Sequence, residues 1–501
     1  MNHFTRLVLA LSCLPAISPA LAQHAPITED ELREHITVLA SDEFEGRGPG
    51  TRGENLSIDY IARQWAGFGL VSGTEDPDHR WFQPVPLVER NPWAFSAQFA
   101  RGGKALKLPA DRIQLVGRDA ANQARGGLIF VGYGADADGK VIADVRGKIA
   151  IMMTGQPDFA PDENYPARAE RAVALADAGA EAVISVLGPQ FSWAAVQNSL
   201  KRGATSLGDA DRDAAITGFM AGDYAAMLFE GAGSDLAMLQ QAAANPEFSG
   251  VDLPVSAEFM ATSTVRRFDS HNVIGKLPGR IPGSGAVVLT GHWDHLGICR
   301  DESHDDRICN GAIDNASGIA VMTAMAKRLA EGPSLDRDVY FIATTAEERG
   351  LLGARHYAAH PAFPLENIVV LLNIDTIAVH QAGAPSAIIG RGTSPLAEEI
   401  DKVAAEMGRT VELSEDANSF LRRQDGWEFT KKGVPAFMVG GSFADLDFLQ
   451  NFLGEDYHQP SDEVNDRLVL SGAREDAELH LALVRHFADS QKYPVPATRA
   501  R

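Results

Sequence analysis

The hydrophobic and polar positions from about residue 270 onward follow two alternating patterns. Continuous apolar runs predict buried strands at 286–290, 339–344, 368–374 and 434–439. Between them, apolar residues recur at helical spacing and predict helices near 319–329, 395–407 and 472–489. Continuous apolar strands that alternate with helices are typical of a parallel sheet covered on both faces. We therefore expect an α/β fold in which a mainly parallel mixed sheet is flanked by helices.

Residues 120–260 have a different character. A strand at 128–131 runs into a glycine-containing turn, and further apolar strands follow at 149–153 and 182–186. No grouping of metal-ligating or nucleophilic residues occurs along this stretch. We expect a separate β-rich insert here, with residues 23–119 and 261–501 forming one domain around it.

The N-terminus has the pattern of a secretory signal peptide. Arg6 precedes an apolar run over 7–17 that is too short to span a bilayer, and small residues lead up to a cleavage site after Ala22. The alternative is a buried N-terminal helix. We expect residues 1–22 to be a signal peptide, the protein to be exported to the periplasm or secreted, and no integral membrane segment to remain after cleavage.

Composition narrows the function classes. The 501 residues carry 67 Asp and Glu against 45 Lys and Arg, a net charge of −22, which argues against nucleic-acid binding. Three cysteines exclude a disulfide scaffold and a four-cysteine zinc module. In an oxidising compartment we expect Cys299 and Cys309 to be paired. Two buried thiols are the alternative.

Polar residues that bind metals follow the predicted strands. In parallel α/β sheets, ligands bind at the carboxyl ends of the strands. The residues at these ends and in the neighbouring loops are His292, Asp294, Asp314, Glu347, Glu348, Asp375 and His458.

A metal site follows from this set. Two histidines and three carboxylates suit zinc, with cobalt or manganese as substitutes. Five ligands are too many for one tetrahedral catalytic zinc, but they fit two ions that share one carboxylate and hold a hydroxide between them. Of two adjacent glutamates, one can bind metal while the other accepts a proton.

The ordered motifs resemble a known family. His-x-Asp at 292–294, Asp-Asn-x-x-Gly at 314–318, Glu-Glu at 347–348, Asn-x-Asp at 373–375 and Tyr-His-x-Pro-x-Asp-Glu at 457–463 look like the zinc-dependent aminopeptidases of the M28 family. Residues 39–48 resemble its N-terminal segment. Residues 120–260 resemble the protease-associated (PA) domain that is inserted in many members.

The resemblance implies a role for each residue. Asp314 would bridge two Zn²⁺ ions, His292 and Asp375 would complete one site, and Glu348 and His458 the other. Glu347 would be the general base and later the general acid. Asp294 would orient His292 through its second ring nitrogen. The implied activity is removal of N-terminal residues from peptides with a free N-terminus.

Some positions depart from the family. Gln424 and Gly426 stand where Ser and His are common, and the group that stabilises the oxyanion is unassigned. Arg422 and Arg423 keep a carboxypeptidase open as an alternative, because such an enzyme binds the substrate carboxylate with Arg or Lys. A glutaminyl cyclase and a non-catalytic binding protein on the same fold are further alternatives.

Overall fold

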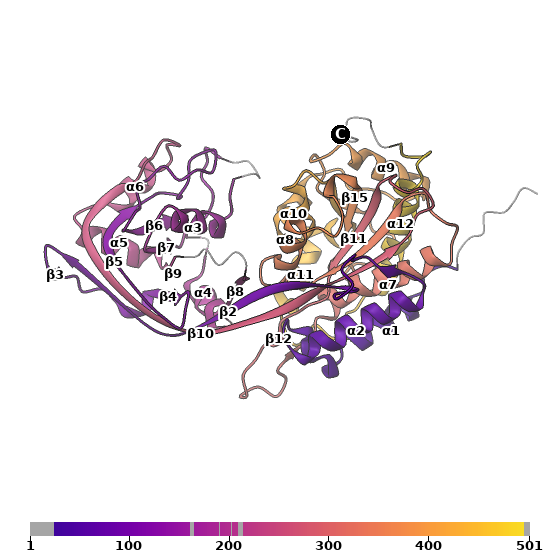
Figure 1. Cartoon of the computed structure of the whole chain (residues 1–501), viewed down its shortest axis with the longest axis horizontal. Helices are drawn as coiled ribbons and strands as arrows, with labels where there is room; N and C mark the ends of the chain where they lie inside the picture. The colour runs from indigo at the N-terminus through magenta and orange to yellow at the C-terminus, as the bar shows by residue number, and fades with distance from the viewer. Residues whose placement is uncertain (1–24, 161–164, 190, 202, 209–213, 495–501) are drawn as a thin grey trace, which may run out of the picture.

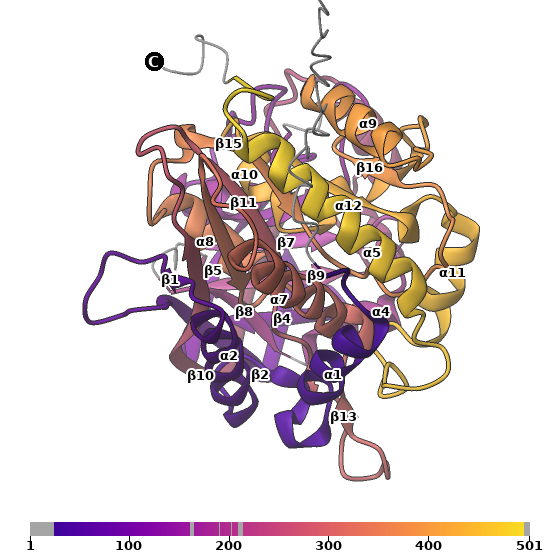
Figure 2. The ribbon, with the colours of Figure 1, turned by 90° about the vertical axis from the view of Figure 1, so that its right-hand side faces the viewer.

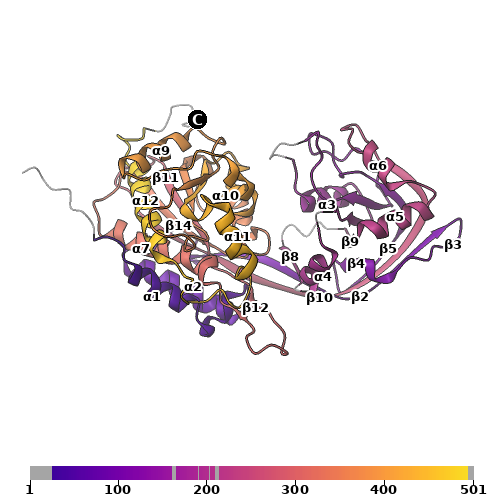
Figure 3. The same ribbon diagram turned by 180° about the vertical axis from the view of Figure 1, so that it is seen from behind.

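The computed structural model describes residues 25–160, 165–189, 191–201, 203–208 and 214–494. The predicted signal peptide lies outside these residues. The chain forms two lobes joined by two long strands, β2 (Phe82–Arg101) and β10 (Val251–Leu277) (Figures 1 and 3). These strands pair in antiparallel fashion along nearly their whole length, with an irregularity between Thr262 and Ser263.

The larger lobe is built on the predicted parallel sheet. Its strand order is β16–β17–β15–β11–β14–β10, and the four inner strands run parallel to one another, whereas β16 and β10 are antiparallel to their neighbours. The strands are β11 (Ala286–His292), β14 (Asp338–Thr344), β15 (Ile368–Asn373), β16 (Ala387–Ile389) and β17 (Ala436–Gly440). The expected fold class is confirmed.

Helices cover both faces of this sheet because its strands are apolar on both sides. Val287 and Leu289 of β11 belong to the core under one helical layer, and Val288 between them belongs to the core under the other. The first layer holds α1 (Glu29–Leu39), α2 (Arg52–Gly67), α7 (Ser317–Ala330), α9 (Leu396–Glu406) and α12 (Leu470–Ala488). In Figure 2, α7 and α12 cross in front of the sheet. The second layer holds α8 (Leu352–Ala359) and α10 (Gly426–Thr430).

The smaller lobe continues from β10 with its own sheet and core. The order is β10–β5–β6–β7–β9–β4, and β5, β6, β7 and β9 run parallel. Its core gathers residues of these strands and of one helix, including Phe130, Ile151, Ile184 and Phe229. The strands are β4 (Ile113–Gly117), β5 (Ala121–Phe130), β6 (Ile149–Met153), β7 (Ala182–Val186) and β9 (Ile216–Met220); the helices are α3 (Arg168–Asp177), α4 (Trp193–Lys201), α5 (Gly222–Gly231) and α6 (Leu236–Ala242).

Polar contacts join the two lobes besides the long strands. Lys431 Nζ lies 3.1 Å from Glu170 Oε1, and Arg422 donates to Gln156 Oε1 at 3.2 Å. The remaining elements are α11 (Leu446–Glu455) and the short strands β1 (Val71–Ser72), β3 (Lys104–Ala105), β8 (Ala204–Leu207), β12 (Gly297–Ile298) and β13 (Ile308–Cys309). Among the described helices, none is both long and apolar enough to cross a membrane.

Candidate metal centre

The carboxyl edge of the larger sheet collects the polar residues that the sequence singled out. β11 ends at His292, β14 runs into the turn with Glu347 and Glu348, and β15 is followed by Asp375. Because β14, β11 and β15 are adjacent and parallel, these residues emerge side by side. Asp314 comes from the turn before α7, and His458 from the loop after α11.

Asp314 lies at the centre of this cluster. Its Oδ1 is 3.2 Å from His292 Nε2, which in turn lies 3.5 Å from Asp375 Oδ1. Its other oxygen, Oδ2, is 3.4 Å from His458 Nε2, which lies 2.8 Å from Glu348 Oε2. The structure thus brings the five proposed ligands together, with one carboxylate facing both halves of the set.

His295 is a further member that the sequence analysis did not single out. It is fully buried, and its Nδ1 lies 2.6 Å from Glu348 Oε1 and 4.0 Å from Asp314 Oδ2. Donor atoms of His295, Asp314 and Glu348 form one compact group, and those of His292, Asp314 and Asp375 form another. The sequence feature that could have identified His295 is its position directly after the His-x-Asp motif at 292–294.

Several buried polar atoms of the cluster have no hydrogen-bond partner among the described residues. These atoms are Glu348 Oε1, His458 Nε2, Asp294 Oδ2 and both ring nitrogens of His295. His295 and Glu348 approach each other closely, but without hydrogen-bond geometry. Buried polar atoms are rarely left unpaired. A metal ion accepts lone pairs from this nitrogen and oxygen set, so the residues fit such an ion.

The electrostatics also favour a bound cation. Burial raises the pKa of Glu347 well above its ordinary value, and the nearby carboxylates Asp375 and Glu348 raise it further. Burial likewise raises the pKa of Asp294 to about 7. Although burial opposes it, hydrogen bonds to His292 and His458 hold the pKa of Asp314 well below the usual range. Crowded buried carboxylates of this kind are stabilised by positive charge.

The adjacent glutamates face different partners. Glu348 meets the two histidines, whereas Glu347 lines a small cavity together with Asp314 and Asp375. The carboxylate of Asp294 accepts the main-chain N–H of Glu347 at 3.1 Å. His292 Nδ1 lies 3.0 Å from the main-chain oxygen of Asp294 and 3.8 Å from its carboxylate. Asp294 therefore supports both His292 and the turn that carries Glu347.

Two buried charges of opposite sign hold the turn that carries Asp314. Arg47 donates to the carbonyls of Asn310 at 2.6 Å and Gly311 at 2.9 Å. Asp462 accepts the N–H groups of Ile313 at 2.9 Å and Asp314 at 3.1 Å. Arg47 lies within residues 39–48 and Asp462 within the motif at 457–463, but neither motif indicated that these side chains hold the turn of Asp314.

The cavity beside Glu347 has a volume of about 40 Å³. Polar and apolar residues share its walls, and Arg423 and Tyr457 are among them. The Tyr457 ring stacks on His458 with centroids 3.7 Å apart. Gln424 and Gly426 are the two positions that depart from the family motif. They bond to each other here, since Gln424 Oε1 accepts the main-chain N–H of Gly426 at 2.7 Å. They stabilise the turn that follows Arg423.

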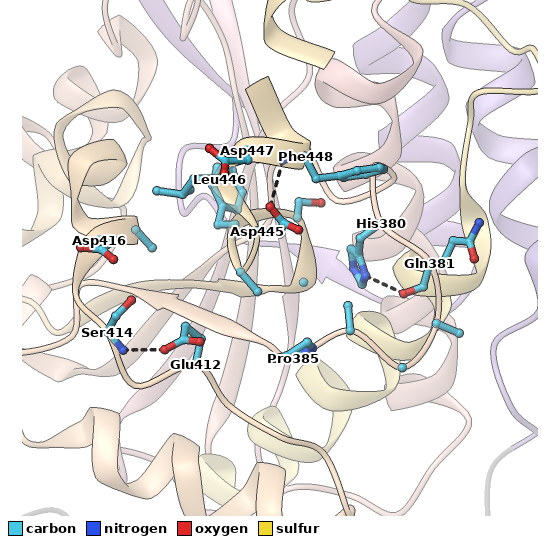
Figure 4. A pocket seen from close by; sticks show the side chains of 18 residues that line it. His380, Gln381, Pro385, Glu412, Ser414, Asp416, Asp445, Leu446, Asp447 and Phe448 are labelled. Carbon is cyan, nitrogen blue, oxygen red and sulfur yellow. Dashed lines mark hydrogen bonds between the residues drawn. The ribbon is translucent and has the colours of Figure 1, made fainter. Parts of the chain in front are cut away.

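A larger cavity of about 900 Å³ lies next to this site (Figure 4). The two cavities share Phe443. His380 lines the larger one, where it lies 2.9 Å from the main-chain oxygen of Gln381 and 2.9 Å from Asp476 Oδ2. None of the predicted site residues lines it.

A disulfide joins Cys299 and Cys309, with an Sγ–Sγ distance of 2.04 Å. It closes the β12–β13 hairpin, which packs against the loop of His458. Cys309 Sγ lies 3.6 Å from the main-chain oxygen of His458, and Arg300 donates to Gln459 Oε1 at 2.5 Å. The hairpin thus restrains a loop that carries a proposed ligand.

Comparisons with known proteins agree with the resemblance seen in the motifs. Residues 272–484 match peptidase family M28. The aminopeptidase YwaD of Bacillus subtilis is 35% identical over 141 residues, which are 27% of this chain and 29% of YwaD. A probable leucine aminopeptidase 2 of Aspergillus oryzae is 27% identical over 312 residues, which are 60% of this chain and 52% of that protein. The chain thus matches about half or less of these curated relatives' own lengths.

A solved structure extends the likeness to the fold of nearly the whole chain. The aminopeptidase from Aneurinibacillus sp. strain AM-1 is 18% identical and superimposes with a TM-score of 0.54. The match covers 92% of this chain and 94% of that one. At this identity the similarity establishes the shared fold.

Proposed function

We propose that this protein, whose residues 272–484 form a peptidase family M28 domain, is an exported aminopeptidase that works with two Zn²⁺ ions. The observation that carries the proposal is the placement of Asp314, whose two carboxylate oxygens face two separate groups of nitrogen and oxygen donors. The three similar proteins described above, from Bacillus subtilis, Aspergillus oryzae and Aneurinibacillus, are named as aminopeptidases, which supports the choice of reaction.

In this proposal His292 and Asp375 hold one ion, Glu348 and His458 hold the other, and Asp314 serves both. His295 lies beside Glu348 in the second group of donors. Zinc, when bound, polarises the scissile carbonyl and lowers the pKa of the attacking water. Cobalt or manganese is expected to substitute because both accept the same donors.

Glu347 is the proposed acid–base residue. Its carboxylate accepts a proton from the attacking water and returns it to the nitrogen of the leaving amine. Asp294 fixes the main chain of Glu347 and so aims the carboxylate.

Tyr457 is a proposed donor to the substrate carbonyl oxygen, a task that no residue fills by motif. It lines the catalytic cavity, and burial together with Asp314, Glu348 and Glu347 raises the pKa of its phenol. The hydroxyl therefore stays protonated at neutral pH and can donate a hydrogen bond.

The remaining expectations belong to the same proposal. Residues 1–22 are a signal peptide that exports the protein to the periplasm or beyond. The smaller lobe, which contains residues 120–260 and also β4 (Ile113–Gly117), is a PA-like insert, and the peptidase domain is made of the chain before and after it. Substrates are peptides with a free N-terminus, whose protonated amine is attracted by the carboxylates of the site.

Hydrolysis of leucine arylamide tests the function. We expect activity that a chelator abolishes and that added Zn²⁺ restores. The matched substrate is N-acetyl-leucine arylamide, which lacks the free amine and should resist cleavage. Cleavage of the blocked substrate, or activity unaffected by chelation, would contradict an aminopeptidase of this type.

A further inference from the structure

We propose that Arg423 binds a carboxylate of the substrate and that the enzyme therefore prefers dipeptides, whose free carboxylate lies one residue beyond the cleaved bond. The inference rests on the proposed aminopeptidase function and adds a substrate class to it. An acidic side chain on the second residue offers the same carboxylate chemistry, and the experiment below separates these two sources.

Arg423 is one of the residues that line the catalytic cavity. The others include Asp314, Glu347 and Asp375. Its guanidinium stands over the ring of Phe420, 5.1 Å from the ring centroid. Because the cavity is small, a group bound by Arg423 lies within a short distance of the bond that Glu347 acts on.

No carboxylate among the described residues forms an ion pair with Arg423, which is exposed. No other Arg or Lys lines this cavity in the part of the chain that the structure describes. The neighbouring Arg422 is used differently, because it donates to Gln156 of the smaller lobe and lies over the ring of Trp427. The two adjacent arginines thus provide one cation for the lobe contact and one for the cavity.

The amino end of a substrate offers no group that the guanidinium of Arg423 could bind. The protonated N-terminal amine is attracted by the carboxylates and repelled by a guanidinium. A carboxylate, in contrast, binds a guanidinium through two parallel hydrogen bonds. In a dipeptide that carboxylate lies only one residue, at most about 3.6 Å of chain, beyond the leaving nitrogen. It therefore reaches the same cavity as the scissile bond.

The main chain after Arg423 is fixed by buried side chains. Gln424 bonds to Leu421 and Gly426, and Asp425 bonds to Thr344 at the end of β14. A fixed main chain limits the positions open to the guanidinium, and such preorganisation strengthens binding. The protein's net charge of −22 would otherwise oppose the approach of a substrate carboxylate.

The experiment compares leucyl-glycine, leucyl-glycine amide and leucyl-aspartic acid α-amide, which keeps only its side-chain carboxylate, on the zinc-loaded enzyme. We expect kcat/KM for leucyl-glycine to exceed that for its amide by about 10- to 100-fold, the worth of a hydrogen-bonded charge pair. Arg423→Gln should remove this preference by raising KM for leucyl-glycine while kcat and the amide are little changed. Arg423→Lys should restore part of it. Arg422→Gln, the matched control, should keep it.

Each outcome bears on the inference. Equal rates for leucyl-glycine and its amide, or loss of the preference in Arg422→Gln as well, would overturn it. A high rate for the aspartic acid α-amide alone would assign Arg423 to an acidic side chain and overturn the preference for dipeptides. If no peptide is cleaved, the proposed function fails, and calorimetric binding of leucyl-glycine against its amide still tests Arg423. Tighter binding of leucyl-glycine that is lost in Arg423→Gln supports the inference, and equal binding overturns it.

Discussion

The two lobes are built on the same kind of parallel strands but end them differently. In the larger lobe the strands lead into His292, Glu347 and Asp375. In the smaller lobe the strands lead into small or apolar residues. Thr154, which follows β6, donates its hydroxyl to the carbonyl of Val186 at the end of β7 at 3.0 Å. The chain has no histidine between His79 and His271. A parallel sheet therefore offers an edge for ligands, and the residues placed there decide whether chemistry follows.

The two lobes also differ in what their buried arginines hold in place. Arg171 in the smaller lobe is buried and donates to the main-chain oxygens of Tyr133 and Gly155. Arg47 in the larger lobe also donates to carbonyls, but two of these, Asn310 and Gly311, precede a proposed metal ligand. The same interaction thus stabilises a loop in one lobe and a candidate catalytic centre in the other.

The largest effect is expected from Glu347→Gln. Turnover should fall by about 10²–10⁴-fold because the acid–base group is lost, whereas the metal content should stay near that of the wild type. Steady-state kinetics and metal analysis measure both. Glu398→Gln, in a Glu-Glu pair on the surface of α9, should have no effect. Near-normal turnover in Glu347→Gln would show that the role is misassigned.

Asp314→Ala should reduce the metal content more than Asp375→Ala. In the proposed arrangement, the first change removes a ligand from both ions and the second from one. Elemental analysis of the purified variants counts the ions. Asp447→Ala, an exposed carboxylate at the larger cavity, should retain both. Equal losses in the two ligand variants would argue against a shared carboxylate.

Matched core substitutions test whether the lobes differ as proposed. Leu289→Ala in β11 and Ile184→Ala in β7 both truncate fully buried side chains and should each cost about 2–5 kcal/mol of unfolding free energy. Only Leu289→Ala should also weaken metal binding, because β11 carries His292. Denaturant unfolding and zinc titration measure the two properties. Weaker zinc binding in Ile184→Ala would place the smaller lobe within the metal centre.

Loss of the disulfide should have a smaller effect on stability. The closed loop is short, so Cys299→Ser with Cys309→Ser should cost at most about 2–3 kcal/mol. The variant should lose zinc more readily than it unfolds, because the hairpin contacts the loop of His458. Thiol titration of the denatured, unreduced protein without residues 1–22 should find no free thiol. Two free thiols would exclude the bridge in solution.

The smallest effect concerns pH. Although burial opposes it, the contact with Asp476 raises the pKa of His380 above 6.5. The stabilisation by this pair should be complete below the unfolded pKa of about 6.5 and should decline as pH rises through the folded value. The difference in unfolding free energy between wild type and His380→Gln should therefore shrink from pH 5.5 to pH 9. A constant or growing difference would contradict the assignment.

The sequence by itself determined the sheet and most of the ligand set. Strand and helix periods are local, so the runs at 286–290, 339–344 and 368–374 could be assigned before their neighbours were known. Because parallel strands end at one edge, His292, Glu348 and Asp375 could also be expected to meet. Asp314 and His458 were candidates from the neighbouring loops, and the resemblance to the M28 family, which the match over residues 272–484 supports, gave them their roles.

Only the tertiary structure decided which residues surround this set. His295 and Asp462 lie in loops, and Arg47 and Arg423 end short 3₁₀ helices (Asp42–Arg47 and Asp416–Arg423), so no periodic pattern reveals their partners. Arg47 meets Asn310 and Asp462 meets Asp314 across more than a hundred residues of chain. Such contacts depend on how loops from the N-terminal segment, the α7 turn and the C-terminal region converge over the sheet. Local sequence sets what a residue can bond to, but the packing of distant segments sets what lies within its reach.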